Sequence, residues 1–514
     1  MMGIPRPALA AVPALTALVL AGAAATAAAT ASAAAAGAPA HRPAAAAPGQ
    51  LVTYGYDNAR DGHDTREPSF AHLKAAWSDG DNVISGGIYG EPLVDGKLVI
   101  VATENDKVYG LSAATGKVAW SYTVGTPARL STIDSAPTLN SSCGDIDPLG
   151  ITGTPVIDPV HSELYVAAEV QTGSTTSPTW PGIEHVMVAL KFTATSVSLA
   201  WQHQIDPPGA GTTYYIPAEQ QRSALTLANG HVYAEYGGLN GDCGSYQGYV
   251  VAMAASGTGA LESWEVPTVR EGAIWATDGA ATGPGGELFV ATGNSNNDSG
   301  AFDYGDAIIG LSPSLKIDGY FAPSDWAQRN VDDLDLGSGG PTLLPGSTLL
   351  FETGKHAVDG TSAGYLMLRS KLGGVGHPAF RGTVCPGSVN VYGANAAESI
   401  KVSGQERHYL FVPCPGGTVA LRVTYGAKPS FRRVWAAHGP NGTPIIAGGL
   451  VWALATDADF GSGPEDLYGM SPVTGKVRVK EAVRPVEHFA TPGAGDGMIY
   501  VASQIGVQAF KPAG

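Results

Sequence analysis

The sequence predicts an all-β protein, a β-propeller of about eight four-stranded blades closed into a ring by an N-terminal strand. Three observations lead to this fold. A phrase of short β-branched runs and tight turns recurs along the chain, helical periodicity of any length is absent, and 69 glycines accompany only 14% charged residues. Many short strands joined by tight turns have this composition. Internal repeats of roughly 50 residues are typical of propellers.

The clearest copy of the repeat spans residues 90–125. In it, LVIVAT alternates as a strand, KVYGLS follows a polar turn, and ATGK makes a tight turn into VAWSYTV. The phrase returns with drift as far as VQAF, which ends at Phe510. At roughly 50–55 residues per unit, the series predicts eight blades. Seven blades is the alternative, because the fifth unit, from PTLLPG onward, is poorly formed.

The last unit, residues 488–510, lacks an outer strand, and AHLKAAWSDGD at 71–81 is an isolated strand of the right type. We expect this strand to complete the last blade, because ring closure removes exposed strand edges. Tryptophans end the repeated phrase, and we expect them to dock between neighbouring blades: Trp120, Trp201, Trp264 and Trp435.

The N-terminal region predicts export. Residues 1–36 have the layout of a secretory signal peptide, with an uncleaved membrane anchor as the alternative. Residues 37–50 are a linker rich in Ala and Pro, and residues 51–514 form a single propeller domain. No later apolar run is long enough to span a bilayer. The net charge of −16 argues against nucleic-acid partners and anionic membrane surfaces.

The four cysteines, in an exported chain, favour two disulfides. Three pairings are possible, and we favour Cys143 with Cys243 and Cys385 with Cys414. No CxxC is present, which argues against zinc-ribbon or thioredoxin chemistry. No CxxCH is present, so the chain does not attach its own c-type haem.

The phrase VYGLSAATGKVAW resembles the tryptophan-docking repeat of the quinoprotein alcohol dehydrogenase-like propellers. The similarity runs from YGYDNARDG, at residues 54–62, to VQAF, and so covers nearly the whole predicted domain. The resemblance implies the fold. It says less about activity, because this propeller serves both pyrroloquinoline quinone (PQQ) dehydrogenases and non-catalytic scaffolds such as the lipoprotein of outer-membrane assembly.

In the dehydrogenases that the chain resembles, PQQ lies on a tryptophan at the propeller centre, beside a Ca²⁺ ion and under a vicinal disulfide. An aspartate acts as general base, and a basic side chain polarises the quinone. By this resemblance Trp275 matches the tryptophan floor and Asn294 matches the amide metal ligand. Asp335 matches the base, with Asp333 as a near alternative, and Lys355 stands at the position of the basic group.

Three parts of that cofactor site are not matched. The vicinal pair is replaced, since Cys143 is followed by Gly144, and Leu149 stands where a basic residue is expected. The glutamate metal ligand falls near Asp242 and Cys243, and Asp242 could substitute for it. Ca²⁺ takes six to eight oxygen ligands, so a set with fewer anionic ligands binds it weakly.

We therefore expect an exported binding or scaffold propeller with a degenerate cofactor site. It would hold a small polar ligand in the central funnel, or an extracellular protein or glycan at the rim. The alternative is a PQQ- and calcium-dependent dehydrogenase oxidising an alcohol, polyol or sugar. In that alternative Asp335 is the base, Asn294, Asp242 and Asp335 surround Ca²⁺, and Lys355 and Trp275 contact the quinone. A separate electron acceptor would then be required.

Overall fold

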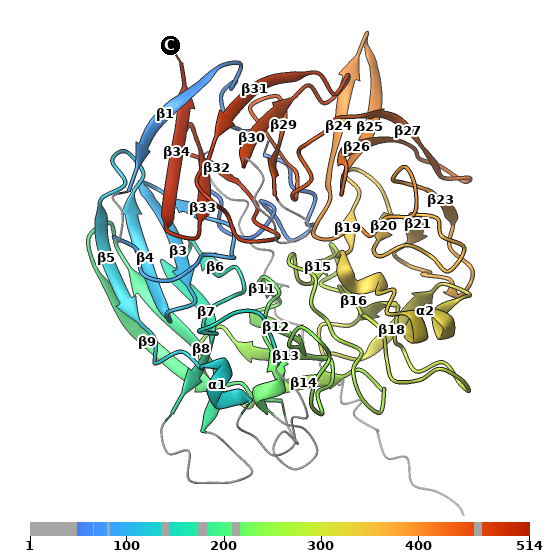
Figure 1. Ribbon diagram of the computed structural model, residues 1–514, viewed down its shortest axis with the longest axis horizontal. Coiled ribbons are helices and arrows are strands. Elements are labelled where there is room, and N and C mark those ends of the chain that lie inside the picture. Colours follow the sequence, from blue (N-terminus) through green and yellow to red (C-terminus); the bar gives the residue numbers. More distant parts are fainter. Residues whose placement is uncertain are drawn as a thin grey trace, which may run out of the picture. The chain divides into compact units, whose positions relative to one another are not determined.

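The computed structural model describes residues 49–64, 66–79, 83–134, 143–172, 182–207, 216–456 and 465–513. The predicted signal peptide lies outside these ranges, as does all but the end of the predicted linker. No helix within them is long and apolar enough to cross a membrane. The strands in these ranges form eight sheets around a common axis (Figure 1). The prediction of eight blades is confirmed, and the seven-blade alternative is wrong.

Each blade is a meander whose first strand lies nearest the axis. Blades 1 to 4 are as follows: β2 (Leu93–Asp95), β3 (Leu98–Thr103), β4 (Lys107–Ser112) and β5 (Val118–Thr123); β6 (Val156–Asp158), β7 (Glu163–Gln171), β8 (Ile183–Phe192) and β9 (Val197–Gln204); β11 (Thr226–Ala228), β12 (His231–Gly238), β13 (Tyr249–Ala254) and β14 (Glu262–Glu265), with β10 (Glu219–Gln220) beside β12; β15 (Ala281–Thr282), β16 (Leu288–Ala291), β17 (Ile308–Leu311) and β18 (Ile317–Ala322), with β22 (Gly374–Val375) parallel to β18.

Blades 5 to 8 follow the same order: β19 (Thr342–Leu343), β20 (Leu349–Thr353), β21 (Ala363–Leu368) and β23 (Phe380–Thr383); β24 (Ala396–Val402), β25 (Gln405–Cys414), β26 (Gly417–Thr424) and β27 (Ser430–Ala436); β28 (Ile445–Ala447), β29 (Leu450–Ala455), β30 (Asp466–Met470) and β31 (Val477–Ala482); β32 (Gly493–Gly495), β33 (Met498–Ser503), β34 (Gly506–Pro512) and β1 (Leu73–Ser78). The predicted closing strand is confirmed, because β1 pairs with β34 from Leu73 opposite Pro512 to Ser78 opposite Gln508.

The tryptophans of the outer strands join neighbouring blades. The indole nitrogen of Trp120, in β5, donates a 3.0 Å hydrogen bond to the carbonyl of Thr193 in blade 2. Trp201 in β9 and Trp435 in β27 make the same bond to the next blade, to Ala255 (3.1 Å) and Pro472 (2.9 Å). Trp264 packs against an apolar cluster shared by blades 3 and 4. The predicted docking of these tryptophans between blades is confirmed.

Trp77 in β1 repeats this contact at the ring closure, where its indole nitrogen donates to the carbonyl of Ala113 in blade 1 at 2.6 Å. Its ring lies over Gly116, in the turn between β4 and β5. Gly116 has a φ of +70°, and a Cβ there would stand 2.4 Å from the Trp77 ring. Glycine is therefore required both by the turn and by the docked indole, which explains the ATGK sequence of this turn.

Residues 49–62, which we call the axial segment, run around the propeller axis before β1 begins. Backbone amides of seven blades donate hydrogen bonds of 2.6–3.0 Å to carbonyls of the segment, and Asn58 donates to the remaining blade, blade 3. In ring order from blade 8, the partners are Asp496, Val94, Ile157, Leu227, Thr282, Leu343, Ala397 and Ile446. The axial segment thus contacts all eight blades and closes one end of the axis.

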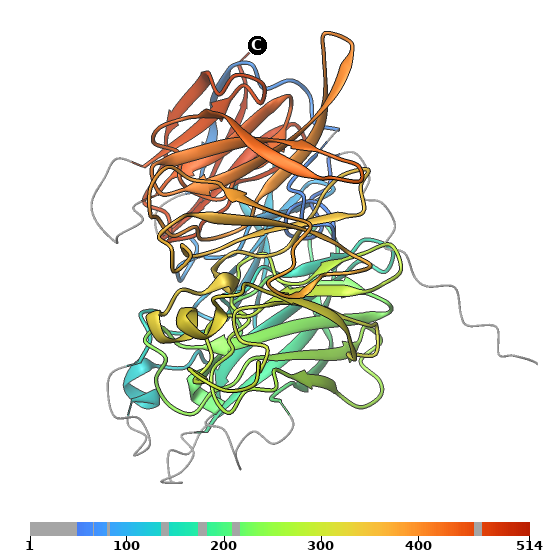
Figure 2. The ribbon, with the colours of Figure 1, turned by 90° about the vertical axis from the view of Figure 1, so that its right-hand side faces the viewer.

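The other end of the axis is the open end. In a meander, the turn after the first strand lies at one end of the blade, and the turn after the second strand lies at the other. The axial segment meets the blades along their first strands and at the turn after β32. The helices α1 (Leu130–Ile133) and α2 (Trp326–Asp332) belong to connections between blades, and both lie on the opposite, open face of the propeller (Figure 2).

Candidate functional site

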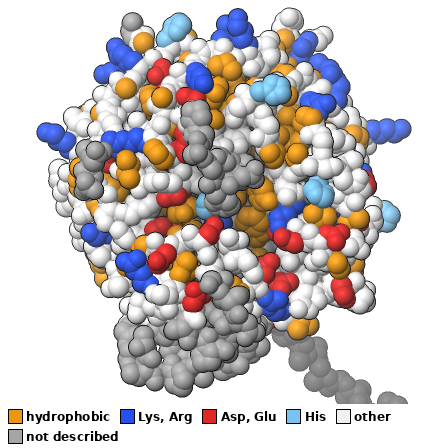
Figure 3. Space-filling model, viewed as in Figure 1, with side chains coloured by type: hydrophobic (Ala, Val, Ile, Leu, Met, Phe, Trp, Pro, Cys, Tyr) orange, Lys and Arg blue, Asp and Glu red, His pale blue; other side chains and the backbone are white. Residues whose placement is uncertain are grey.

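A cavity of about 660 Å³ lies at the open end of the axis. Figure 3 looks onto this face and shows hydrophobic side chains near its centre with acidic and basic side chains beside them. The structure brings together every candidate that the sequence singled out for cofactor, metal or catalytic roles, since all of them line this cavity: Asp242, Trp275, Asn294, Asp333, Asp335 and Lys355. Their chemical roles remain predictions.

Blades 4 and 5 supply most of these side chains. Trp275 precedes β15, and Asn294 follows β16, where the second strand of blade 4 ends. Asp335 stands between α2 and the short 3₁₀ turn η2 (Leu336–Ser338), and Lys355 follows β20. Connections after second strands and before first strands all lie at the open end, so the meander itself directs these residues to one cavity.

Lys355 is held between two aspartates. Its Nζ lies 2.5 Å from Oδ1 of Asp333 and 2.7 Å from Oδ2 of Asp335. The other oxygen of Asp335 accepts a 2.6 Å hydrogen bond from the backbone amide of Asn294. Burial by itself lowers the pKa of Lys355, but Asp335 and Asp333 outweigh it and raise the pKa above its ordinary value. Lys355 therefore stays charged, and both oxygens of Asp335 already have partners.

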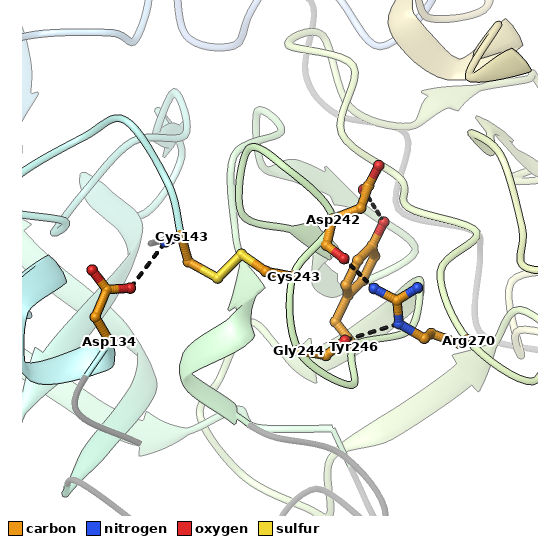
Figure 4. Close-up of a disulfide and its surroundings, with 7 residues drawn as sticks. All are labelled: Asp134, Cys143, Asp242, Cys243, Gly244, Tyr246 and Arg270. Atoms are coloured by element: carbon orange, nitrogen blue, oxygen red, sulfur yellow. Dashed lines mark hydrogen bonds between the residues drawn. A yellow bond between two sulfur atoms is a disulfide. The ribbon is translucent and has the colours of Figure 1, made fainter. Parts of the chain in front are cut away.

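Asp242 is fixed by its own loop (Figure 4). Its Oδ1 accepts a 2.5 Å hydrogen bond from the Tyr246 hydroxyl, and its backbone carbonyl accepts one from Arg270. Arg270 also donates to the carbonyl of Gly244 at 2.9 Å. Burial raises the pKa of the Asp242 carboxyl. These contacts make Asp242 part of the loop's internal packing.

A disulfide anchors the same loop. Cys143, in the connection between blades 1 and 2, bonds to Cys243, with 5.9 Å between the Cα atoms (Figure 4). The bond lies in an apolar cluster that includes Leu239, Tyr246 and, at its edge, Trp275. The second disulfide joins Cys385 to Cys414, next to the cavity-lining Pro413 and Pro415. Both predicted pairings are confirmed, and both bonds lie at the open end.

One wall of the cavity is aromatic and carries an arginine that sequence reasoning missed. The ring centroids of Tyr392 and Phe489 are 5.5 Å apart, and each lies within 6.5 Å of Trp275. The guanidinium carbon of Arg222 stands 4.5 Å from the Phe489 centroid and 5.8 Å from that of Trp275. A cation over aromatic faces is attracted by their quadrupoles, so this wall holds Arg222 in place without hydrogen bonds.

Arg222, His488 and Phe489 also line a second, much smaller cavity of about 10 Å³, which Tyr54 of the axial segment borders. These three residues therefore form the floor of the main cavity on the side of the closed end. Within the described ranges, no hydrogen bond or ion pair reaches the guanidinium of Arg222, and its Nη2 is buried without a partner.

Comparisons with known proteins place this geometry in context. A family model described as outer membrane protein assembly factor BamB matches residues 74–175. A europium-containing methanol dehydrogenase is 16% identical with a TM-score of 0.60, over 90% of this chain and 91% of that one. Two quinohemoprotein alcohol dehydrogenases, from Pseudomonas putida HK5 and Comamonas testosteroni, are 12% and 13% identical with TM-scores of 0.59 and 0.57. They cover 90% and 91% of this chain and 80% and 81% of their own.

The chain has the quinoprotein alcohol dehydrogenase-like propeller fold. Identities this low show the fold alone. A search of curated protein sequences finds no match. Whether this quinoprotein-like propeller can hold the cofactors of that group depends on its own side chains.

The donor set of this quinoprotein-like propeller does not fit calcium. Asp335 is bound through both oxygens, and Asp242 is bound to Tyr246. In the described part of the chain, no three acidic, histidine or cysteine side chains are placed to share a metal ion. Ca²⁺ takes six to eight oxygens, so Asp242, Asn294 and Asp335 as metal ligands remain a prediction that this donor set does not favour. The ring of Trp275, expected to carry the quinone, already has Arg222 over it.

The residues that sequence reasoning missed share a position in the repeat of this quinoprotein-like propeller. Five first strands are preceded directly by proline, and in four of them the residue three places before the proline lines the main or the small cavity; the exception is β19, which follows Pro341. These residues are Tyr89, Thr152, Asn441 and Phe489, before Pro92, Pro155, Pro444 and Pro492. Aligning the prolines of the repeats would have identified them as facing the axis.

Proposed function

We propose that this protein is a binding propeller that holds a small polar ligand in its central cavity and does not carry out quinoprotein dehydrogenation. The observation that supports this most directly is the ion pair of Lys355 with Asp335 at 2.7 Å. A general base must place a free oxygen against the proton that it removes. In Asp335, one oxygen faces the Lys355 ammonium and the other faces the Asn294 amide.

The lining of the cavity fits a ligand with one apolar face and several polar groups. Trp275, Tyr392 and Phe489 make an aromatic wall, and the other lining residues include carboxylates, asparagines and Lys355. Small-molecule sites are commonly concave, of about 300–1,000 Å³, with aromatic walls and a few placed polar groups. The cavity volume of about 660 Å³ lies within this range.

We further propose that the protein acts outside the cytoplasm after removal of a signal peptide at 1–36, with residues 37–50 as a linker and residues 51–514 as one propeller. The two disulfides support this, because such bonds persist in oxidising compartments. An extracellular protein or glycan bound at the rim is compatible with the same location.

A second candidate function, a PQQ- and calcium-dependent dehydrogenase, is favoured by one observation. The four side chains that match that group, Trp275, Asn294, Asp335 and Lys355, line one cavity although they come from separate connections. Shared ancestry of the fold accounts for this convergence equally well, because fold does not determine activity.

Calorimetric titration separates the two functions. The purified mature chain is titrated with PQQ plus Ca²⁺, with the Asp335→Asn variant alongside. Under the proposal no heat is expected at high-micromolar cofactor. Tight, Ca²⁺-dependent binding that Asp335→Asn abolishes would overturn the proposal and establish the dehydrogenase.

A ligand test supplies the positive evidence. Saturation-transfer NMR with a panel of monosaccharides and polyols should detect contacts that Trp275→Ala abolishes. Trp435→Phe, at a blade junction away from the cavity, is the matched control and should leave them unchanged. Absence of any contact with the folded wild-type protein would contradict the proposal.

A further inference from the structure

The guanidinium of Arg222 stands out among the charged groups of the cavity because the described chain gives it no polar partner. Its Nη2 is buried, and no described side chain or carbonyl accepts a hydrogen bond from it. The lysine of the site, Lys355, has two carboxylates within 2.7 Å. Arg222 is half-buried on the cavity wall, and a buried donor without a partner is unfavourable, so an acceptor on a ligand in the cavity that pairs with this guanidinium is favoured.

The acidic side chains near Arg222 form no ion pair with it in the described chain, so its positive charge is available to an anionic ligand. Asp145 is the nearest in influence, and its Oδ2 lies 3.9 Å from Nε2 of His488, but it forms no ion pair with Arg222. Burial raises the pKa of Glu104 to about 8, which leaves that carboxyl mostly neutral at pH 7. Burial, together with Arg222 itself, lowers the pKa of His488 to about 3. His488 is therefore neutral at pH 7 and does not offer an anionic ligand a second positive charge beside Arg222.

The position of Arg222 suits a carboxylate attached to a ring. Guanidinium groups bind carboxylates through two parallel hydrogen bonds. Phe489 and Trp275 lie against the same guanidinium, and Tyr392 extends the aromatic wall. A sugar ring has apolar C–H faces that pack on aromatic rings, and its hydroxyls match the side-chain amide of Asn294, which also lines the cavity.

We propose that the central cavity takes a sugar acid, a pyranose bearing one carboxylate, and that this carboxylate pairs with Arg222. The inference rests on the proposed binding function and adds the class and charge of the ligand. Arg222 sets the preference for an acid, and the aromatic wall of Trp275, Tyr392 and Phe489 holds the ring.

The test compares sugars that differ only in the acid group. D-glucuronate is paired with D-glucose, and D-galacturonate with D-galactose, by calorimetry on the mature chain at low salt. We expect at least one acid to bind at least about tenfold more tightly than its neutral partner, because charge-assisted hydrogen bonds are roughly twice as strong as neutral ones. Arg222→Gln should remove this difference, and Arg222→Lys should keep part of it.

Arg432→Gln is the matched control, because Arg432 is exposed on β27 in blade 6. It should bind all four sugars as the wild type does. Circular dichroism and thermal melting establish that each variant is folded. If Arg222→Gln does not fold, Arg222→Lys serves as the test variant in its place.

Two outcomes would overturn the inference and are distinguishable. Neutral sugars that bind as tightly as the acids, or an acid preference that survives in Arg222→Gln, would leave the proposed binding function standing and remove the role of Arg222. No binding of any sugar by the folded wild-type protein would contradict both proposals together.

Discussion

Each end of the propeller axis contains an arginine, and the two differ in how much hydrogen bonding the chain gives them: Arg60 is fully buried, whereas Arg222 is half-buried with a buried Nη2. At the closed end Arg60 is 1% exposed, and its three nitrogens donate five hydrogen bonds to the axial segment and to blades 3 and 4. At the open end Arg222 has no such partner in the described chain. An arginine whose donors are all used holds the fold together. One whose donors are unused is available to a ligand.

The means of fixing the two ends differ as well. Hydrogen bonds from eight blades hold the axial segment at the closed end. At the open end, loops of varied length leave a cavity, and two disulfides hold them. The closed end is thus specified by repeated backbone geometry, whereas the open end depends on individual side chains, which is where sequence can change function without changing the fold.

Replacement of Arg60 should have the largest effect. Arg60→Met removes all five hydrogen bonds and leaves the carbonyls of Leu225 and Ala280 unpaired by this side chain. We expect a loss of about 3–5 kcal/mol in the free energy of unfolding, the usual cost of removing one partner from a buried polar network. Urea denaturation followed by far-UV circular dichroism measures it. A loss below about 1 kcal/mol would mean that the closed end is not held by Arg60.

Removal of the disulfides tests the open end. Cys143→Ala with Cys243→Ala opens a link across 100 positions, and Cys385→Ala with Cys414→Ala opens one across 29. Chain entropy predicts losses of about 4.7 and about 3.6 kcal/mol as upper figures. We expect the first pair to lower the thermal midpoint more than the second. The reverse order would show that native contacts, and not loop length, set the difference.

The closed end should weaken as pH rises. Burial raises the pKa of Glu91 to about 8, from an ordinary value near 4.5, while Oε2 accepts a hydrogen bond from the amide of Gly55 in the axial segment. The folded state therefore holds a proton that the unfolded state releases. The stabilising effect of this proton on the folded state is complete below about pH 4.5 and is lost as pH rises to about 8.

Hydrogen exchange at the Gly55 amide, measured from pH 5 to 9 and corrected for the intrinsic rate, reports this loss. Glu91→Gln keeps the shape of the neutral acid and should flatten the pH dependence. If the variant keeps the wild-type slope, other buried acids such as Asp278, whose pKa burial raises to about 7, are responsible.

Replacement of Arg222 should have the smallest effect on stability. Because the described chain gives the guanidinium no hydrogen bond, Arg222→Met should leave the free energy of unfolding within about 0.5 kcal/mol of wild type, or raise it slightly. The same urea experiment as for Arg60→Met measures it. A loss comparable to that of Arg60→Met would remove the contrast between the two ends.

Much of the fold could be predicted because it is repeated. Strands of the types LVIVAT and VAWSYTV recur often enough to count the blades. The isolated strand around Trp77 could be placed because only the last unit lacked an outer strand. The fifth blade was hard to recognise because its outer strand is only Phe380–Thr383, without a tryptophan. The axial segment escaped prediction, since YGYDNARDG has no strand periodicity and acquires its order only from contacts with all the blades.

The candidate site was predicted through resemblance to a known group of proteins, so residues outside the matched pattern were missed. Asp242, Trp275, Asn294, Asp335 and Lys355 were found because they match a known pattern. Their actual partners, such as the amide of Asn294 on Asp335, depend on ångström-scale placement that spacing cannot give. Arg222 was overlooked because it belongs to no such pattern and no proline directly precedes the first strand of its blade. Phe489 was overlooked because the prolines of the repeats were not aligned.

The pairing of β1 with β34 gives the assembly of this protein an order in time. Of the strands of the propeller, β1, which completes blade 8, is synthesised before all the others, and its partner β34 is synthesised after them. Tyr54 and Thr491, which are hydrogen-bonded across the axis, are 437 positions apart. Until the C-terminal strands emerge, the stacked blades form an open arc with unpaired edges that invite aggregation, and pairings this distant form slowly. A nascent chain of this protein is therefore exposed to aggregation until β34 has emerged and paired with β1.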